Sequence, residues 1–576
     1  MELPNEIIDL IIGYLHDRQD ILTLTRTCQN WSKCAIRKLY TEIPLTIAHD
    51  CKELGPLENM IGSSSVNFEP TRGLAILPKH TSPDSYPATL AGADPAYVHD
   101  NRQTVLPVLQ PATDNLNLLI RVLLGKIPQN SLISFNWAHD YSIEPETYIK
   151  LVQFHGESLR WLQLRNCKGE WRKVTPVAAG LQSFFSTCVT PPTKFKAGLV
   201  AGNSSTLRNL ELGSEDLVVY YFNSMHFIDV DEQTEKTLHF CETLAERADP
   251  ADISVPILKL ESLKVIGWDL RPLVNGSYRP ITDFNSLTSL ILESCCGLYD
   301  ALTMLTEVSN GRTVSRLPNL QSLSIRNEHD EHRDFPRTLD YFLRSLSPLR
   351  TLHLLNSGAY IVRTSKHFLE IHGATLRTLV YDERLGQRHD LADDRLVDLR
   401  DGGRLTTIVK HCPNLVELGI SLRWNDGQDV PPEGHRAHVA GLLSKLKHLK
   451  TLNIRNLPPM GTSALTCFVD VDMMLQGLVD ELVKDLVLLR RSERMPQLRI
   501  IGLGALFYRD VWDGTVVDGV TGIDDVLRLR IWAINYAENA RGAPTPILTK
   551  VAYGYPGNIE KDISEDLNIF QPYWLG

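Results

Sequence analysis

Residues 3–40 read LPNEIIDLIIGYLHDRQDILTLTRTCQNWSKCAIRKLY, and this stretch determines how the start of the chain folds. Aliphatic side chains at helical spacing give a first helix one broad apolar side: Ile7, Ile8, Ile11, Ile12 and Leu15. Pro4 stands near the first helical position, where its missing N–H costs nothing. Two further short helices are predicted, one capped by Asp20 and one opened by Thr27 or Gln29. Because about forty residues are close to the lower size limit for independent folding, such apolar faces need a cover from elsewhere.

The same stretch resembles the F-box. The resemblance rests on the Leu-Pro start, an acidic residue, paired aliphatic residues, a second aliphatic block and Trp31. It departs where Thr27-Cys28-Gln29-Asn30 replaces the commoner Val-Ser-Lys-Arg, a change that leaves the apolar positions intact. The resemblance implies binding to the Skp-type adaptor of a cullin–RING ubiquitin ligase through Leu3, Pro4, Ile8, Ile11, Leu15, Leu22, Leu24 and Trp31. The alternative is an amphipathic helical cap on the domain that follows.

Composition is typical of a globular protein without a membrane span. The chain has 576 residues, of which 43% are hydrophobic and 22% charged. Neither a secretory signal nor a transmembrane segment is expected. Ten scattered cysteines favour reduced thiols, and therefore a cytoplasmic or nuclear protein. The net charge of −10 and the absence of long basic runs disfavour nucleic acid as the partner.

Residues 41–114 are predicted to be a linker or insertion, partly irregular. An extended run leaves the first helices at residues 41–48, and one short strand is expected near Leu74–Leu77. Between them and beyond, prolines, glycines and serines are frequent and the apolar periodicity is weak.

From residue 115 onward one unit recurs, a helical pattern followed by a strand spelled Leu-x-x-Leu-x-Leu. The strand blocks are LISFNW from 132, LRWLQL from 159, LRNLEL from 207, LESLKV from 260, LTSLIL from 287, LQSLSI from 320, LRTLHL from 349, LRTLVY from 376, LVELGI from 415, LKTLNI from 449 and LRIIGL from 498. Their starts lie between 27 residues (132 to 159) and 53 residues (207 to 260) apart. Several helical stretches stand upstream of these strands, including 339–346, 405–409, 439–446 and 471–489.

This unit resembles the irregular leucine-rich repeats that accompany many F-boxes. Leu317-Pro318-Asn319 and Cys412-Pro413-Asn414 resemble the Cys-Pro-Asn-Leu opening of such repeats. The fold class that follows is α/β: a small three-helix F-box (1–40), the linker (41–114), a leucine-rich-repeat solenoid or horseshoe (115–510) and a C-terminal cap (511–576). Stacked units would bury the strand leucines in one continuous column.

Residues between the leucines would point outward to the concave face of the solenoid. Charges of both signs alternate there with apolar residues, which suits a protein or peptide substrate better than a phosphate backbone. The candidate substrate-binding residues are Arg165, Glu211, Lys264, Glu293, Arg326, His353, Asp382 and Arg455. The sequence does not identify the substrate, nor whether it must be phosphorylated.

The C-terminal region is rich in aromatic residues. A helix is expected at Asp524–Asn539 and a strand at Ile547–Tyr553. An open solenoid needs a cap over its last unit, which is one interpretation of this region. The other is that the aromatic stretch 507–512 forms part of a substrate pocket.

No arrangement of residues points to catalysis. His329/His332 and His435/His438 are spaced three apart but follow strands in charged loops, so no metal site is predicted, and no cofactor is expected. The predicted function is the non-catalytic substrate receptor of an SCF-type ubiquitin ligase. A non-degradative, adaptor-bound scaffold is the alternative, which the sequence does not exclude.

Overall fold

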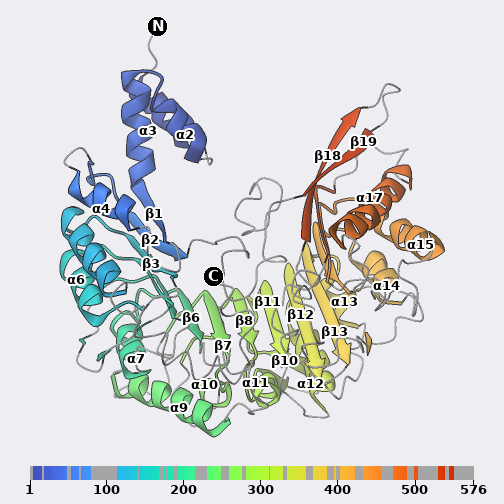
Figure 1. The fold of residues 1–576 in the computed structure, drawn as a ribbon. Helices are drawn as coiled ribbons and strands as arrows, with labels where there is room; N and C mark the ends of the chain where they lie inside the picture. Colours follow the sequence, from blue (N-terminus) through green and yellow to red (C-terminus); the bar gives the residue numbers. More distant parts are fainter. Residues whose placement is uncertain are drawn as a thin grey trace, which may run out of the picture. The chain divides into compact units, whose positions relative to one another are not determined.

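The computed structural model describes residues 4–13, 15, 18–47, 54–63, 66–78, 113–139, 142–165, 167, 170–171, 174–175, 178–186, 193–213, 230–247, 258–274, 281–309, 312–327, 334–358, 367–385, 395–396, 403–421, 433–455, 471–489, 498–503, 530–538 and 544–550. The protein is a mixed α/β structure with an N-terminal helical region and open sheets of many strands (Figure 1). It divides into two compact units. The first unit comprises residues 1–217, 235–260 and 276–283, and the second 218–234, 261–275 and 284–576.

The N-terminal helical region consists of α1 (Asn5–Gly13), α2 (Arg18–Leu24) and α3 (Gln29–Thr41), as the apolar spacing predicts. The Pro4 carbonyl accepts the first helical hydrogen bond, from Ile8 N–H at 3.1 Å. Asp20 lies inside the first turn of α2 instead of capping it, because the helix begins at Arg18. Strand β1 (Glu42–Ile47) follows α3 directly.

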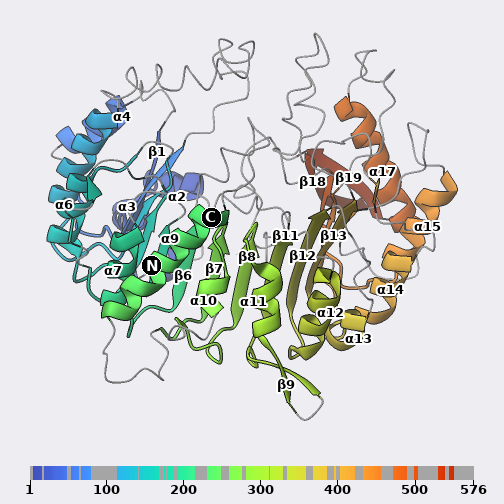
Figure 2. The same cartoon turned by 90° about the horizontal axis from the view of Figure 1, so that it is seen from below.

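In the first unit, strands β1 to β6 pair in chain order and in parallel. After β1 come β2 (Gly73–Pro78), β3 (Ser134–Trp137), β4 (Trp161–Leu164), β5 (Ser183–Ser186) and β6 (Asn209–Gly213). The connections contain α4 (Gly55–Gly62), a helix over residues 113–126, α6 (Pro145–His155) and α7 (Thr193–Gly202). Figure 2 shows α4, α6 and α7 on one face of this sheet. Helix α9 (Val230–Arg247) contributes residues to both units.

In the second unit, the parallel strands are β7 (Ser262–Ile266), β8 (Ser289–Glu293), β11 (Ser322–Asn327), β12 (Thr351–Gly358), β13 (Thr378–Leu385), β15 (Glu417–Ile420), β16 (Thr451–Ile454) and β17 (Ile500–Leu503). The helices are α10 (Arg271–Val274), α11 (Leu298–Met304), α12 (Phe335–Ser345), α13 (His367–His372), α14 (Gly403–His411), α15 (Glu433–Leu443) and α17 (Val471–Leu489). Helices α11 to α15 cover one face of this sheet (Figure 2).

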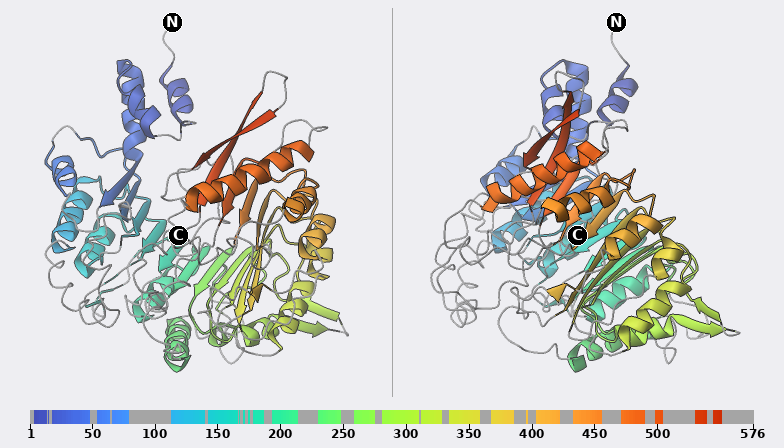
Figure 3. Two further views of the ribbon diagram at one scale, coloured as in Figure 1. Left: turned by 45° about the vertical axis from the view of Figure 1, so that its right-hand side comes forward. Right: turned by 90° about the vertical axis from the view of Figure 1, so that its right-hand side faces the viewer.

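Antiparallel strands complete the second unit. Strand β18 (Arg530–Glu538) pairs with β17, and β19 (Pro544–Lys550) pairs with β18 (Figure 3). Strands β9 (Thr306–Ser309) and β10 (Arg312–Ser315) form a hairpin, and the short β14 (Arg395–Leu396) pairs with the end of β13.

Each predicted Leu-x-x-Leu-x-Leu block contains a strand, and its leucine positions face the core. In β12, for example, Leu352 and Leu354 are fully buried and align with Leu323 and Ile325 of β11. Burial of one such side chain contributes about 1.5–3 kcal/mol, which is why the alternation specifies the strand.

Hydroxyl side chains join consecutive strand–helix repeats through a recurring hydrogen bond, here called the inter-unit brace. The serine or threonine just before the first leucine of one repeat donates this bond to the backbone carbonyl of the first leucine of the preceding repeat. Among the described residues, this bond joins Ser158 Oγ to Leu132 O at 2.7 Å, Thr206 Oγ1 to Leu181 O at 2.8 Å and Thr375 Oγ1 to Leu349 O at 2.7 Å. Each brace satisfies a carbonyl at the start of a strand with a side chain from the neighbouring unit.

A buried polar residue stands three positions before the hydroxyl in each of these units: His155, Asn203 or His372. Nδ1 of His372 accepts from Leu349 N–H at 3.3 Å, and its Nε2 lies 2.8 Å from Leu343 O. The Asn203 side-chain oxygen accepts from Leu181 N–H at 2.8 Å. These side chains therefore bond to backbone groups at the end of one helix or at the start of the preceding strand, where regular backbone pairing is incomplete.

Three parts of the fold differ from the sequence prediction. The predicted linker contains the extended run and the short strand expected within it, as β1 and β2, but it also contains α4, and both strands belong to the sheet of the first unit. Strand β5 was not predicted. Residues 530–538, expected to be helical, form β18, whereas the strand expected at Ile547 is present as β19.

Candidate functional site

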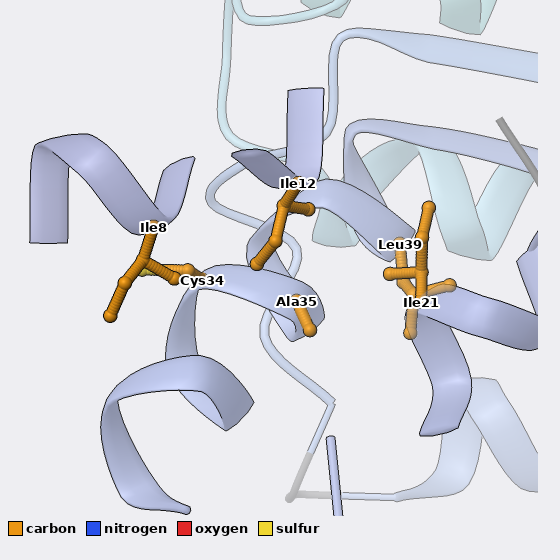
Figure 4. Close-up of a cluster of buried hydrophobic side chains, with 6 residues drawn as sticks. All are labelled: Ile8, Ile12, Ile21, Cys34, Ala35 and Leu39. Carbon is orange, nitrogen blue, oxygen red and sulfur yellow. The ribbon is translucent and has the colours of Figure 1, made fainter. Parts of the chain in front are cut away.

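The helical region at the N-terminus has a small core of its own. Figure 4 shows the buried residues that form it: Ile8, Ile12, Ile21, Cys34, Ala35 and Leu39. Leu15, Leu24, Trp31 and Tyr40 are partly buried and pack against this cluster. An ion pair between Asp9 and Arg37 also joins α1 to α3. The three helices therefore pack on one another and leave their remaining apolar side chains on the surface.

These exposed apolar side chains are unusually dense for so short a segment. Among the described residues of the region they are Leu10 (60% exposed), Ile7 (44%), Leu22 (41%), Ile36 (40%) and Ile11 (37%). We call this set the apolar surface of the helical region. Clusters of exposed aliphatic side chains mark places where another molecule packs.

The residues predicted to bind the adaptor fall into three groups. Pro4, Ile11 and Leu22 are exposed, and Leu15, Leu24 and Trp31 are half-buried against the core. Ile8 is only 2% exposed, so its expected place on the surface is wrong: it faces α3 and supports the bundle. Leu3 lies outside the described residues. Sequence reasoning missed Ile7, Leu10 and Ile36, although each is an apolar residue of a helix that the sequence predicts.

Residues 1–45 match the F-box-like family. The N-terminal helical region is thus an F-box-like domain, and it runs into β1. F-box domains generally bind Skp-type adaptors, so the match suggests an adaptor-binding role for this region. No curated protein matches the chain.

On the sheet of the second unit, the outward residues form rows across the strands, in the register that the repeats predict. One row contains Glu293, Arg326, Leu355 and Asp382, which pair in this order. A parallel row contains Lys264, Ile291, Ser324, His353 and Val380. Outward position therefore follows from the strand pattern.

Near β13 and β16, side chains on the outward face of the sheet are nevertheless buried. Arg455 is 1% and Asp382 4% exposed, and Arg455 Nε donates to Asp382 Oδ2 at 3.0 Å. Ser421 Oγ donates to the second oxygen of Asp382 at 2.7 Å. His353 is also buried, and its pKa is lowered to about 3 by burial and by the nearby Arg455 charge. In this state neither Arg455 nor Asp382 is open to a substrate, contrary to the sequence prediction.

The other predicted substrate residues differ in accessibility. Lys264, Arg326 and Arg165 are half-buried, whereas Glu293 and Glu211 are buried. Lys264 and Arg326 lie on the outward face of the second unit, and Arg165 and Glu211 belong to the first unit. The strand blocks from 159 and 207 follow one another in the sequence prediction, but β5 stands between these strands and places Phe185 beside both Gln163 and Glu211.

The described part of the chain contains no group of three or more side chains arranged to hold a metal ion, and none of its helices has the length and hydrophobicity of a membrane span. Of the four histidines considered as ligands, His438 is exposed on α15; His329 and His332 lie outside the described residues, as does the side chain of His435.

Proposed function

We propose that this protein is the substrate-recognition subunit of an SCF-type cullin–RING ubiquitin ligase. The F-box-like domain binds the Skp-type adaptor, and the strand–helix units form a leucine-rich-repeat array whose outward sheet face binds a protein substrate. The chain catalyses nothing itself, and it acts in the cytoplasm or nucleus. Its contribution is proximity and orientation, because the ubiquitin-transferring chemistry belongs to its partners.

The F-box-like match at residues 1–45 is the observation that carries the proposal. The apolar surface of the helical region supports it, since the core of the bundle is complete without Leu10, Ile11 and Leu22. A partner that covers these side chains removes apolar area from water, at about 25 cal/mol per Å². The repeated Leu-x-x-Leu-x-Leu strands and the inter-unit braces support the second half of the proposal.

Co-purification with the adaptor tests the first half. Ile11→Glu combined with Leu22→Glu places two charges on exposed positions of α1 and α2 without touching the bundle core. We expect adaptor recovery to fall at least about tenfold, because buried unpaired charges oppose binding. Leu118→Glu, on the helix at residues 113–126, changes a leucine that is even more exposed and lies outside the helical region, and it should leave recovery unchanged.

Equal adaptor recovery by the double variant and by wild type would overturn the proposed docking surface. Recovery of no adaptor by wild type would overturn the function itself. The same samples, probed for the cullin, separate a ligase receptor from an adaptor-bound scaffold, since only the receptor needs the cullin.

A further inference from the structure

A row of basic side chains crosses the second unit at the end of the sheet where its parallel strands begin. The row is formed by the residue that follows the first leucine of consecutive strand blocks. Each member donates its backbone N–H to the carbonyl of the member before it, at 2.7–2.8 Å. Side chains at this shared position leave the backbone in the same direction, about 4.8 Å apart. We call the set the basic row, and its members are Arg350, Arg377, Val416, Lys450 and Arg499.

The cations of the basic row are accessible to solvent. Arg350, Arg377 and Arg499 are exposed, and Lys450 is half-buried. The guanidinium of Arg499 lies 5.7 Å from the ring centre of Tyr536, a contact that orients the charge without neutralising it. At physiological salt, charges within about 8 Å of one another are only partly screened. The cations therefore repel one another until an anion binds, and their attractions for that anion add together.

The turns beside the basic row carry little opposing charge. In the described stretches 346–351, 373–378, 412–417, 444–451 and 498–500, Glu417 is the one carboxylate, and it is 1% exposed. The turn between α15 and β16 adds the exposed side chains of Lys445, Lys447 and His448. Glu370 of α13 is the nearest preceding carboxylate to residue 373, and it pairs with a histidine of its own helix at 3.3 Å. This edge is therefore basic in a chain with a net charge of −10.

A structural role accounts for the equivalent arginines of the first unit but not for these side chains. Arg160 and Arg208 hold the same position in their strand blocks, and each donates through Nη1 to carbonyls of its own turn. In the described part of the chain, neither Arg350 nor Lys450 has a side-chain hydrogen bond or an ion pair. Their charges are therefore available to another molecule.

We propose that the basic row binds an acidic segment of a partner protein, in which aspartate or glutamate side chains recur along an extended chain. The row crosses five strands, and four steps of about 4.8 Å give about 19 Å, the length of roughly six extended residues. Carboxylates form charge-assisted hydrogen bonds with arginine and lysine, and complementary charge guides such a partner to its site.

Two other polyanions fit this surface less well. In the five stretches that contain the basic row, no large apolar side chain is exposed that could insert into a membrane. A nucleic acid carries phosphates well beyond the four cations, and the net negative charge of the chain repels them. The basic row belongs to the second unit and the F-box-like domain to the first, so the proposal adds an interaction surface and does not require the proposed function.

Fluorescence anisotropy with the full-length protein tests the proposal. The probe is a labelled peptide in which glutamate and serine alternate, and the comparison peptide has glutamine in place of glutamate. Wild type should bind the glutamate peptide at least about tenfold more tightly, and raising the salt concentration from about 0.05 M to about 0.3 M should weaken that binding about fivefold. Arg350→Gln combined with Lys450→Gln should also weaken it about fivefold, because two exposed ion pairs are lost.

A matched control is Lys194→Gln combined with Lys259→Gln, which removes the same charge from exposed lysines of the first unit. It should leave the affinity for the glutamate peptide within about twofold of wild type. Thermal unfolding verifies that each variant is folded; if the basic-row variant is not, Lys445→Gln combined with Lys450→Gln decides.

Three results would overturn the proposal: equal binding of the two peptides, a basic-row variant that binds as wild type does, or the same loss in the control variant. Tighter binding of a single-stranded oligonucleotide or of phosphatidylserine vesicles than of the glutamate peptide would overturn the choice of an acidic protein segment. Adaptor recovery, measured in parallel, reports separately on the proposed function.

Discussion

The buried ion pair between Asp382 and Arg455 allows a direct test of the second unit. Arg455 Nε lies 3.0 Å from Asp382 Oδ2, and the two side chains are 1% and 5% exposed. Ser421 donates to the other carboxylate oxygen at 2.7 Å. The three residues come from β13 and from the positions directly after β15 and β16, so the pair forms only when these strands are in register.

Removal of one partner should be far more costly than removal of both. Arg455→Met leaves the Asp382 carboxylate buried without the Arg455 cation, and Asp382→Leu leaves the Arg455 guanidinium buried without the Asp382 anion. We expect each change to lower the free energy of unfolding by about 3–5 kcal/mol. The double variant loses the ion pair, but it no longer has to bury either of the two charges. We therefore expect its free energy of unfolding to lie within about 2 kcal/mol of the wild-type value.

Urea unfolding of the full chain measures these differences, and hydrogen exchange in peptides from β13, β15 and β16 assigns them to the second unit. Asp340→Asn serves as the control: it weakens a longer ion pair, in which Arg344 Nη1 lies 3.8 Å from Asp340 Oδ2 and Arg344 is 47% exposed, so a smaller change is expected. Single variants with effects below about 1 kcal/mol, or a double variant as unstable as the sum of the two, would refute the reasoning.

Three further predictions concern other parts of the chain. Burial lowers the pKa of His353 to about 3, so His353 stays neutral in the folded protein, whereas in the unfolded chain it takes up a proton below about pH 6.5. The free energy of unfolding should therefore fall by about 2 kcal/mol between pH 7 and pH 5 because of this residue. His353→Gln should remove that part of the pH dependence, as measured by urea unfolding. Ile12→Ala, at a position 1% exposed, should cost about 2–4 kcal/mol and speed hydrogen exchange across residues 4–41, whereas Ile11→Ala should change exchange little. Gly297→Ala, at φ +63° and with its new Cβ 2.8 Å from Asp269 Oδ1, should lower thermal stability by about 1–3 kcal/mol, and a neutral result would contradict the left-handed geometry.

The sequence predicts the strands well because leucine burial and strand period are local properties. Strand β5 was not recognised because Leu181 is followed by Phe184 and Ser186 at the positions that hold leucine or isoleucine in most of the other blocks. Strand β18 was taken for a helix, although Trp532 and Ile534 are buried with exposed or half-exposed residues between them. In both cases the inward alternation is preserved and only the residue types are unusual.

The candidate sites depended more on long-range structure. The position of Ile8 in the bundle core requires the packing of α1 on α3, which the amphipathic pattern of α1 alone does not specify. The pairing of Asp382 with Arg455 joins residues 73 positions apart in sequence, so their burial could not follow from either strand alone.

The inter-unit brace has a consequence for how such a chain can lengthen. Each strand–helix repeat that carries the hydroxyl, such as those of Thr206 and Thr375, also begins its strand block with a leucine. The backbone carbonyl of that leucine is the kind of group to which the hydroxyl of a following repeat donates. A unit copied whole and inserted in tandem would therefore bring both halves of the connection and leave no orphaned group at either junction. Gene duplication could add or remove single units at little energetic cost, and the breadth of the outward face could evolve without redesign of the interior.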